Sequence, residues 1–503
     1  MAKFFISDTK KLDSKYGKWY YYQKGCRVLK KDGRLIIYYG YTIHKPINEY
    51  IETDPYSLKY SNGKYCVVIL EKNHMEVIVD YFCQTKIFYR NTDRIEVTNQ
   101  IYMMPLTSSD INIQELNERK KAKHLFKSEV DADKNSPIEQ LFGHHQYKND
   151  VTKTIWNDVY VLEPDHCIVA DKKITVERLH NTLERNKQAF NFNNPGQMVI
   201  DPHNQVRWPF RSARDAEEYI HVCMEDHANI IKKTYKNVAN SISEGIDSVL
   251  IDQYFPDAKR IMYNMNPPSG PFEYKQKIIN DYKSRNIPIE LYTMEQDQAG
   301  EVAAETLNDP DVFFLDMLPS YAQAKQLKDV DVLLFGQNGD QMFMHRPTFL
   351  YAYLFSKQYA NDNNKEEVIE KYKDCYSATK DIWAYKGYSL ENEIEKRAGR
   401  DWKEFFAYDA LPGLYNREME HCIEVPTTSL YCDKRIFNVV HQLDEKHMFE
   451  SVKDASIQKN ILKRKFNYSI PTPNKDGSPF DLWPIVTPML KATIANCLED
   501  HLA

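Results

Sequence analysis

Short apolar runs separated by turn-forming residues fill the first part of the chain, a pattern that predicts β-strands. The dipeptide Asp32-Gly33 lies between the apolar runs 27–29 and 35–39, and Asp-Gly readily supplies the positive φ angles of a tight hairpin turn. Two further apolar runs, residues 64–70 and 75–79, are separated by a polar break. These runs predict an antiparallel meander within a sheet that is buried on at least one face.

The same half of the chain continues with one predicted helix and then more strands. We expect a helix over residues 113–127, with Asp110 available as its cap. Apolar residues predict further strands at 158–162 and 167–170. The segment 190–211 is rich in Asn and Pro and predicts a linker to the second half.

Beyond this linker the pattern changes to strands that alternate with helices. Strands separated by helices of about 10–15 residues imply βαβ units and a parallel sheet. Residues 349–470 are mainly helical in pattern, so the expected fold class is α/β with two domains and a helical C-terminal part. The predicted elements before that part are a helix at 215–233, strands at 238–243 and 260–263, a helix at 273–285, and strands at 287–292 and 330–335.

The composition of the 503 residues is that of a folded protein with two or three domains. The 66 Lys and Arg residues nearly balance the 72 Asp and Glu, and this net charge of −6 argues against a dedicated nucleic-acid binder. No apolar run approaches the roughly 20 residues of a membrane span, and the first residues lack the apolar stretch of a secretion signal. The nine cysteines form no CxxC pair, which fits reduced thiols in the cytoplasm.

The most informative stretch lies where a predicted strand meets a helix, at residues 241–248. Gly245 permits a tight turn or the close approach of a ligand. The hydroxyl groups of Ser243 and Ser248, with the amides of the new helix N-terminus, can donate hydrogen bonds to phosphate. Asp247 would repel phosphate unless a divalent cation lay between them, which favours Mg²⁺. The alternative interpretation is an ordinary helix start capped by Ser and Asp.

A second loop of the same kind follows the strand predicted at 330–335. It contains Gly336, Gly339 and Asp340. Because parallel strands of an open α/β sheet present their carboxyl ends at one edge, the two loops would bring two aspartates to one metal–triphosphate cluster. A surface turn built from Asn338-Gly339 is the alternative, and it would require two coincidences in one sheet.

Together these loops resemble those of the asparagine synthetase family. Residues 243–248 are similar to that family's Ser-Gly-Gly-x-Asp-Ser pyrophosphate loop, and residues 336–343 are similar to its second signature. The resemblance implies an N-terminal Ntn-type, glutaminase-like domain at 1–205 and a C-terminal ATP-pyrophosphatase (PP-loop) domain at 206–503. Weaker matches lie at residues 316–319, 417–426, 459–463 and 474–477, and in the first half at 62–65, 80–89 and 154–166.

The resemblance also implies a chemistry. In that family ATP adenylates a substrate carboxylate with release of pyrophosphate, and a nitrogen nucleophile then displaces AMP to form an amide. ATP and Mg²⁺ are the implied cofactors, with the metal held by Asp247 and Asp340. Lys475 is implied to stabilise charge on the oxyanion or the leaving phosphate, and its alternative is an ordinary surface lysine. The residues implied to bind the nucleotide are Ser243, Gly245, Asp247, Ser248, Gly336 and Gly339.

The implied partners are small. They are a small-molecule or peptide carboxylate and an amine or free ammonia, and the sequence does not choose among them. A homodimer is compatible with the sequence, whereas a membrane or a nucleic acid is not expected as a partner.

The sequence also departs from the family pattern. Ala2 stands where glutamine-using members expose a nucleophilic cysteine, and the first thiol is Cys26, well inside the chain. We therefore expect the first half to be a scaffold without glutaminase activity, as in β-lactam-forming and peptide-cyclising relatives. Glu244 and Gln341 replace the usual Gly and Glu, and Gln337 cannot accept a proton, so the base that activates the amine lies elsewhere or is unnecessary.

These departures leave two alternatives to an amide-forming ligase. One is a non-catalytic descendant, a binding or assembly protein that keeps the two-domain scaffold. The other is an adenylating enzyme of the same loop type that acts on a base or nucleotide, against which the match of the first half argues.

Overall fold

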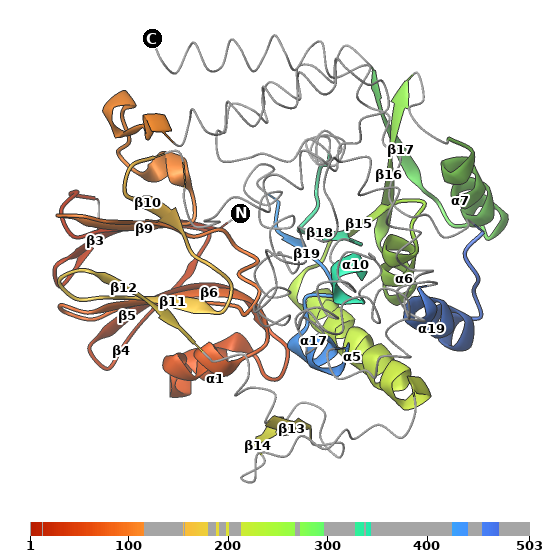
Figure 1. The fold of residues 1–503 in the computed structure, drawn as a ribbon, viewed down its shortest axis with the longest axis horizontal. Helices are drawn as coiled ribbons and strands as arrows, with labels where there is room; N and C mark the ends of the chain where they lie inside the picture. Colours follow the sequence, from red (N-terminus) through yellow and green to blue (C-terminus); the bar gives the residue numbers. More distant parts are fainter. Residues whose placement is uncertain are drawn as a thin grey trace, which may run out of the picture.

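The structure is a computed structural model that describes residues 2–12, 14–114, 154, 156–179, 188–190, 198–200, 213–266, 272–295, 327–336, 339–343, 425–440 and 455–471. Most of these residues belong to two parts of mixed α/β structure. They are called the N-terminal region (residues 2–179) and the C-terminal region (residues 213–471), and they lie side by side (Figure 1).

Among the described residues, the N-terminal region contains two antiparallel sheets stacked face to face (Figure 1). The first sheet has the strand order β10-β8-β9-β1-β3-β2, and the second has the order β12-β11-β7-β6-β5-β4. The strands of the first sheet are β1 (Lys3–Ser7), β2 (Ser14–Tyr16), β3 (Trp19–Lys24), β8 (Phe88–Asn91), β9 (Ile95–Thr98) and β10 (Val159–Val161). Those of the second are β4 (Arg27–Lys31), β5 (Arg34–Thr42), β6 (Gly63–Leu70), β7 (Met75–Val79), β11 (His166–Ala170) and β12 (Ile174–Arg178).

Strand β6 lies at the centre of these layers, and every one of its residues is buried. Val68 belongs to the apolar cluster between the two sheets, together with Trp19 of the first sheet. Its neighbour Val67 faces the other way and packs in a cluster with Ile51 of helix α1 (Ile47–Thr53). The prediction of a sheet buried on at least one face is confirmed, and at β6 both faces are buried.

The predicted hairpin is confirmed at its turn. Strands β4 and β5 pair with Lys31 opposite Arg34, so Asp32 and Gly33 are the two turn residues. Their φ angles are 48° and 72°, both in the left-handed region that a two-residue hairpin turn of this type requires. The predicted meander and the strands near 160 and 168 are also present, as β5 to β7, β10 and β11.

The predicted role of Asp110 is wrong. This residue ends a short 3₁₀ helix (Ser108–Asp110), and its carboxylate accepts a hydrogen bond from the backbone N of Thr107 at 2.8 Å. The same carboxylate accepts from Arg90 at 3.3 Å. The carboxylate therefore caps the turn behind it, and the helix predicted at 113–127 lies almost entirely outside the described residues.

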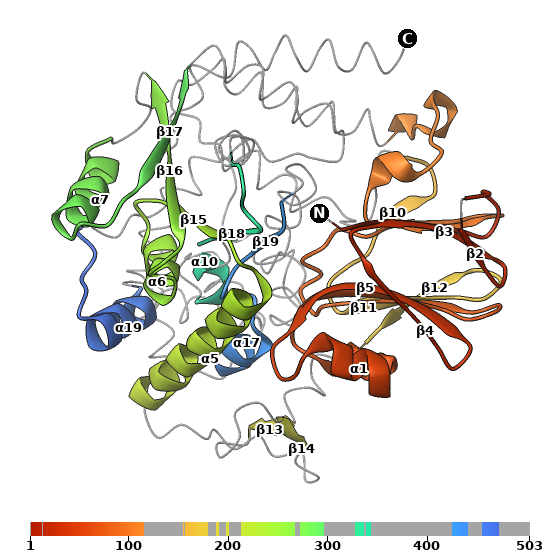
Figure 2. The same ribbon diagram turned by 180° about the vertical axis from the view of Figure 1, so that it is seen from behind.

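The segment predicted as a linker contains a small sheet. Strand β13 (Gln188–Phe190) pairs antiparallel with β14 (Met198–Ile200), with Ala189 opposite Val199. This pair lies apart from the two large sheets in both ribbon views (Figures 1 and 2). The Asn- and Pro-rich stretch thus begins inside a β-hairpin, and the rest of it lies outside the described residues.

The C-terminal region is built on a five-stranded sheet with the order β17-β16-β15-β18-β19, and all its described pairings are parallel (Figure 2). The predicted strand–helix alternation and parallel sheet are confirmed. The strands are β15 (Val238–Ile242), β16 (Lys259–Asn266), β17 (Glu290–Glu295), β18 (Val332–Phe335) and β19 (Thr427–Thr428). The helices are α5 (Ala213–Thr234), α6 (Ile246–Tyr254), α7 (Phe272–Ser284), α10 (Gly339–Met342), α17 (Lys434–Val440) and α19 (Ser456–Phe466).

Strand β17 begins three residues later than predicted, because the preceding helix uses Ile287 to close its own end. The backbone N of Ile287 donates to the carbonyl of Tyr282 at 2.9 Å, and that of Asn286 donates to Lys283 at 3.0 Å. Asn286 has a φ of 56°, so this helix end is a Schellman motif. A residue engaged in such a cap cannot also pair in the sheet.

Helix α5 has 22 residues and one buried face, with charged residues along the rest of its surface. No helix in the described part of the chain is both long and apolar enough to cross a membrane. Of the helical stretch predicted at 349–470, the structure describes α17 and α19 together with the short strand β19.

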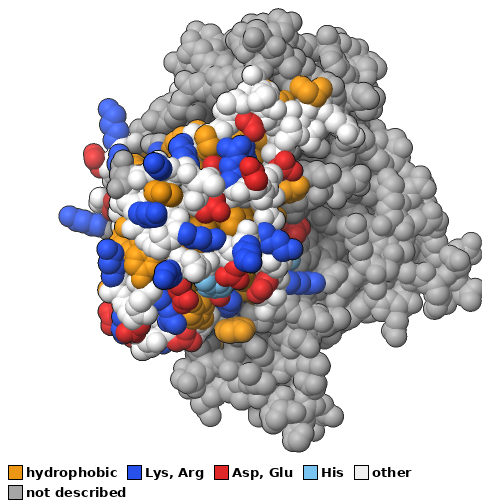
Figure 3. Space-filling view, turned by 90° about the vertical axis from the view of Figure 1, so that its left-hand side faces the viewer, with side chains coloured by type: hydrophobic (Ala, Val, Ile, Leu, Met, Phe, Trp, Pro, Cys, Tyr) orange, Lys and Arg blue, Asp and Glu red, His pale blue; other side chains and the backbone are white. Residues whose placement is uncertain are grey.

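The outer face of the N-terminal region is an ordinary charged surface. Lysine and arginine side chains alternate there with aspartate and glutamate, and apolar side chains are scattered between them (Figure 3). Mixed signs of charge of this kind suit a solvated surface. The opposite side of this region packs on the C-terminal region, where Tyr41 and Phe82 join one apolar cluster with Ile220 of α5.

Candidate functional site

The loop between β15 and α6 is closed by hydrogen bonds among its own residues. The hydroxyl of Ser248 accepts from the backbone N of Ser243 at 2.9 Å and also lies 2.9 Å from the Ser243 hydroxyl. The Ser243 hydroxyl in turn accepts from the backbone N of Gly245 at 3.1 Å. Gly245 is the N-cap of α6, so both hydroxyls are held at a helix N-terminus, where anions are favoured.

The second predicted loop leaves the same edge of the sheet as the first. Strands β15 and β18 are neighbouring parallel strands, with Ser241 opposite Phe335. The chain leaves both strands within two residues of this pair. The expectation that the two loops lie side by side is therefore met by the register of the sheet.

The contact between the two loops requires glycine at two positions. A Cβ on Gly336 would lie 2.8 Å from the Cα of Ser248, which is closer than such atoms approach. A Cβ on Gly339 would overlap the carboxyl group of Asp247. The second loop thus presses its backbone against the first, and the Asp247 carboxyl group lies at the centre of the contact.

Asp247 is held by two residues from distant parts of the chain. The side-chain amide of Gln458, in α19, donates to Asp247 Oδ1 at 3.0 Å. The hydroxyl of Tyr431 donates to the backbone carbonyl of Asp247 at 2.8 Å. The Tyr431 ring also meets the ring of Phe343, which follows the second loop, edge-on at 5.5 Å. Both the side chain and the backbone of Asp247 are therefore fixed in place.

Asp340 directly follows Gly339, so its Cα is about 3.8 Å from the glycine Cα that touches Asp247. Within the described ranges, no group of three or more His, Cys, Asp or Glu side chains is placed to hold a metal ion. Mg²⁺ bound with a nucleotide needs only one or two carboxylates beside the phosphate oxygens. The touching loops place the backbone of Asp340 close to Asp247, which is compatible with that donor set.

The remaining predicted positions differ in what the structure says of them. Glu244 is partly exposed within the first loop. Gln341 lies in α10, which the structure describes only as backbone at that residue. Gln337 and Lys475 lie outside the described residues.

A buried ion pair anchors α6 beneath the loop. Arg260 of β16 donates to Asp252 Oδ2 at 2.9 Å, and Tyr282 of α7 donates to the same oxygen at 3.0 Å. Asn240 of β15 donates to Oδ1 at 3.3 Å. Burial raises the pKa of Asp252, although Arg260 opposes this effect. The helix that follows the loop is thus tied to two strands and to α7, which makes the loop's base rigid.

The first thiol of the chain is not a nucleophile in this structure. Burial raises the pKa of the Cys26 thiol to about 12, so the group is protonated at neutral pH. Its Sγ donates to the backbone carbonyl of Lys3 at 3.5 Å. The carbonyl of Ala2 accepts from the Asn99 side chain at 2.8 Å, so the start of the chain is held by a structural hydrogen bond.

Gln458 and Tyr431 are the two site residues that the sequence did not indicate. Tyr431 follows the stretch 417–426 and Gln458 precedes the stretch 459–463, both of which resemble the asparagine synthetase pattern. Neither residue belongs to a local motif of its own. Their contacts with Asp247 span about two hundred residues and depend on the packing of α19 and of the turn after β19.

No protein-family model matches this sequence, and no curated protein matches it.

Proposed function

We propose that the chain is an ATP-dependent amide-forming ligase related to the asparagine synthetases. The contact between the Asp247 carboxyl group and Gly339 carries this proposal, because it joins both loops at the carboxyl edge of a parallel sheet. Open α/β sheets bind their ligands at that edge. In this proposal residues 1–205 are a glutaminase-like domain without its nucleophile, and residues 206–503 are the ATP-pyrophosphatase domain.

The first loop supplies the groups that a pyrophosphate needs. The Ser243 and Ser248 hydroxyls bond each other and the loop backbone, and rotation of either hydroxyl would present a proton to a phosphate oxygen. The amides at the start of α6 add further donors and the positive end of the helix dipole. Gly245, which is exposed, allows a phosphate to approach the backbone closely.

Asp247 and Asp340 would hold Mg²⁺. When bound, the metal neutralises charge on the departing pyrophosphate. Gln458 fixes the orientation of the Asp247 carboxylate by its bond to Oδ1, so that side chain does not have to be ordered when the nucleotide binds. The partly exposed Glu244 adds negative charge to the loop, which makes the divalent cation more necessary for nucleotide affinity.

The reaction would proceed in two displacements. An oxygen of the substrate carboxylate attacks the α-phosphorus of ATP, and pyrophosphate leaves with the bond to the α-phosphorus. A nitrogen nucleophile then attacks the acyl carbon, forms the amide and releases AMP, with Lys475 stabilising the negative charge that develops. The nitrogen comes from free ammonia or an amine, because burial raises the pKa of the partly buried Cys26 thiol to about 12 and the protonated thiol is a poor nucleophile for glutamine.

The same sheet edge carries a hydroxyl group that a nucleotide would satisfy. Tyr263 lies on β16, one residue beyond the pair Met262 and Ile242, and therefore at the level of Ser243. Its hydroxyl is buried and has no hydrogen-bond partner among the described residues. Burial raises the pKa of Tyr263, so the group stays protonated and can donate.

A non-catalytic scaffold is the second candidate, and Glu244 is the observation that favours it. Its carboxylate stands in the loop where the related enzymes carry glycine, and it reduces affinity for phosphate. A scaffold would keep the fold of the two loops without binding Mg·ATP.

Pyrophosphate release distinguishes the two candidates. The full chain would be assayed with ATP and Mg²⁺ over a panel of carboxylates, with and without amines or ammonia. We expect release by the wild type and by Asp257→Ala, an exposed aspartate that serves as the control, and none by Asp247→Ala or Asp340→Ala. Mg·ATP at 100 times its Kd would also add about 2.7 kcal/mol of stability. Absence of both pyrophosphate release and thermal stabilisation would leave the scaffold.

A further inference from the structure

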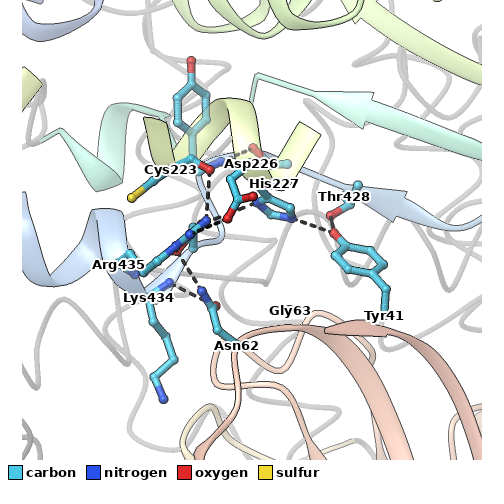
Figure 4. A network of polar contacts seen from close by, with 12 residues as sticks. Tyr41, Asn62, Gly63, Cys223, Asp226, His227, Thr428, Lys434 and Arg435 are labelled. Atoms are coloured by element: carbon cyan, nitrogen blue, oxygen red, sulfur yellow. Dashed lines mark hydrogen bonds and ion pairs between the residues drawn. The ribbon is translucent and has the colours of Figure 1, made fainter. Parts of the chain in front are cut away.

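One segment of the chain is bonded both to the N-terminal region and to the candidate site. This bridging segment (residues 427–435) begins with β19 and ends in the first turn of α17. Its residues are buried throughout. Figure 4 shows Tyr41 of β5 and Asn62, in the loop before β6, reaching toward it, with Thr428 and Lys434 on the other side of the junction.

The first end of the bridging segment is bonded to the second sheet of the N-terminal region. Thr428 donates to the side-chain carbonyl of Gln84 at 3.2 Å, and its hydroxyl lies 3.1 Å from that of Tyr41 in β5. The ammonium group of Lys64 in β6 donates to the backbone carbonyl of Thr427. These are contacts of buried polar groups, whose loss leaves an unsatisfied partner.

The other end of the bridging segment is held by the side-chain amide of Asn62, which both donates and accepts a hydrogen bond. The Asn62 side chain donates to Asp433 Oδ1 at 2.8 Å and accepts from the backbone N of Lys434 at 3.2 Å. Asp433 is further held by Arg435, which donates to Oδ2 at 2.8 Å. The start of α17 is thus fixed to the loop that precedes β6 (Figure 4).

The middle of the segment contacts both loops of the site. Tyr431 donates to the Asp247 backbone and packs against Phe343, as described above. The Tyr431 hydroxyl therefore contacts the first loop, and its ring contacts the residue that follows the second loop. A displacement of the segment would move the backbone of Asp247 or break that bond.

Four polar side chains, Gln84, Thr428, Tyr41 and His227, are connected across the junction. The Gln84 amide donates to the carbonyl of Gly63 and to Asp80, so its oxygen faces Thr428 and takes that hydroxyl's proton. The Tyr41 hydroxyl lies 3.1 Å from that of Thr428 and 2.8 Å from Nε2 of His227. Burial lowers the pKa of His227 to about 4, so the imidazole at this junction is neutral at pH 7.

We infer that the N-terminal region is a positioning element of the candidate site, and that it holds the loop at residues 243–248 through the bridging segment. That the loop at residues 243–248 binds a nucleotide rests on the proposed function. The contacts by which the N-terminal region holds this loop do not. This inference assigns a task to the N-terminal region: its contacts with the bridging segment keep Asp247 in place through Tyr431.

Hydrogen exchange of the full chain, followed by mass spectrometry, tests the link without any ligand. The variants are Asn62→Ala and Tyr41→Phe, which cut the junction, and Tyr431→Phe, which cuts the contact to Asp247. The control is Tyr65→Phe, because Tyr65 is equally buried in β6 but its hydroxyl donates at 2.6 Å to Leu58, within the N-terminal region. We expect amides of residues 243–249 to exchange about fivefold faster in the first three variants and unchanged in the control.

The outcomes separate the inference from the proposed function. Unchanged exchange at 243–249 in both junction variants, or an equal rise in the Tyr65→Phe control, would overturn the positioning role. If the exchange results are as expected but Mg·ATP gives the wild type no protection at these amides, the proposed function fails and the positioning role stands. If Asn62→Ala does not fold, Tyr41→Phe, which removes only one oxygen atom, decides the question.

Discussion

The carboxyl group of Asp247 lies directly against the Cα of Gly339, although the two residues belong to different loops far apart in the sequence. A side chain at position 339 would occupy the place of that carboxylate. The contact therefore depends on two features at once: a parallel register that brings the loops to one edge, and a glycine that lets the backbone approach.

Substitution of Gly339 by alanine should damage both the fold and the site. The added Cβ would overlap the Asp247 carboxyl group, and such overpacking costs about 1–3 kcal/mol of unfolding free energy. Stabilisation by Mg·ATP should be lost in the same variant, since the carboxylate must move. Urea denaturation with and without Mg·ATP measures both effects.

Gly245→Ala provides the matched comparison. Gly245 has a φ of −86°, which alanine adopts without strain, and an added Cβ would meet only the Ser243 hydroxyl, at 3.3 Å. The unfolding free energy should fall by less than about 1 kcal/mol in this variant. Equal destabilisation by the two substitutions would show that the contact with Asp247 is not what requires glycine at 339.

Removal of the Gln458 amide should weaken the metal-dependent part of nucleotide binding. In Gln458→Leu the Asp247 carboxylate loses a donor at 3.0 Å, a bond to a charged group worth about 1.5–3 kcal/mol. We expect the Mg²⁺ concentration that gives half-maximal thermal stabilisation by ATP to rise about tenfold. Gln276→Leu is the control, because that amide donates to Asn280 within the exposed surface of α7. An unchanged Mg²⁺ requirement would mean that Gln458 does not orient Asp247.

The fold and the two loops could be predicted because their causes are local or follow general rules of sheets. Asp32-Gly33 specifies its own turn, and the strand–helix alternation specifies a parallel sheet whose strand ends share an edge. The approach of residues 243–248 to residues 336–339 follows from that rule once the strands are neighbours. None of these steps needs knowledge of a side chain's distant partner.

The supporting contacts could not be predicted, because each depends on how separate elements pack. Tyr431 has no local pattern that distinguishes it from an ordinary core tyrosine, and its bond to Asp247 exists only because β19 pairs next to β18. The predicted start of β17 at Ile287 was wrong for a related reason: a Schellman cap at the end of the preceding helix engages Ile287. Asp110 likewise bonded backward to Thr107 in place of the helix predicted ahead of it.

Two buried tyrosines should respond in opposite ways to the loss of a hydroxyl. Tyr263→Phe removes a hydroxyl without a partner among the described residues, so stability should be unchanged or should rise by up to about 1 kcal/mol. Tyr282→Phe removes a donor to the buried Asp252 carboxylate and should destabilise by about 1.5–3 kcal/mol. Urea denaturation of both variants gives the comparison.

The Tyr263 variant also bears on the nucleotide. If its hydroxyl donates to the bound nucleotide, Tyr263→Phe should weaken ATP binding about fivefold or more while leaving the apo protein as stable as the wild type. Binding measured by titration calorimetry should then show the loss. Unchanged affinity would place the nucleotide away from β16, and destabilisation of the apo protein would reveal a partner for the hydroxyl.

Acid should weaken the junction between the two regions through Asp433. Burial alone would raise the pKa of this carboxyl, but the charge and hydrogen bonds of Arg435 outweigh it and hold the pKa at about 2. The folded-state pKa is thus below the ordinary value of 3.8, so Asp433 contributes stability above about pH 4 and that contribution is lost as the pH falls toward 2.

Asp433→Asn should therefore lower stability by about 3 kcal/mol at pH 7, because it leaves Arg435 without its buried partner. It should also flatten the fall in unfolding free energy between about pH 4 and pH 2, as measured by urea denaturation, whereas Asp257→Asn on the surface should keep the wild-type slope. A variant whose stability falls as steeply with acid as the wild type would show that another carboxylate controls acid unfolding.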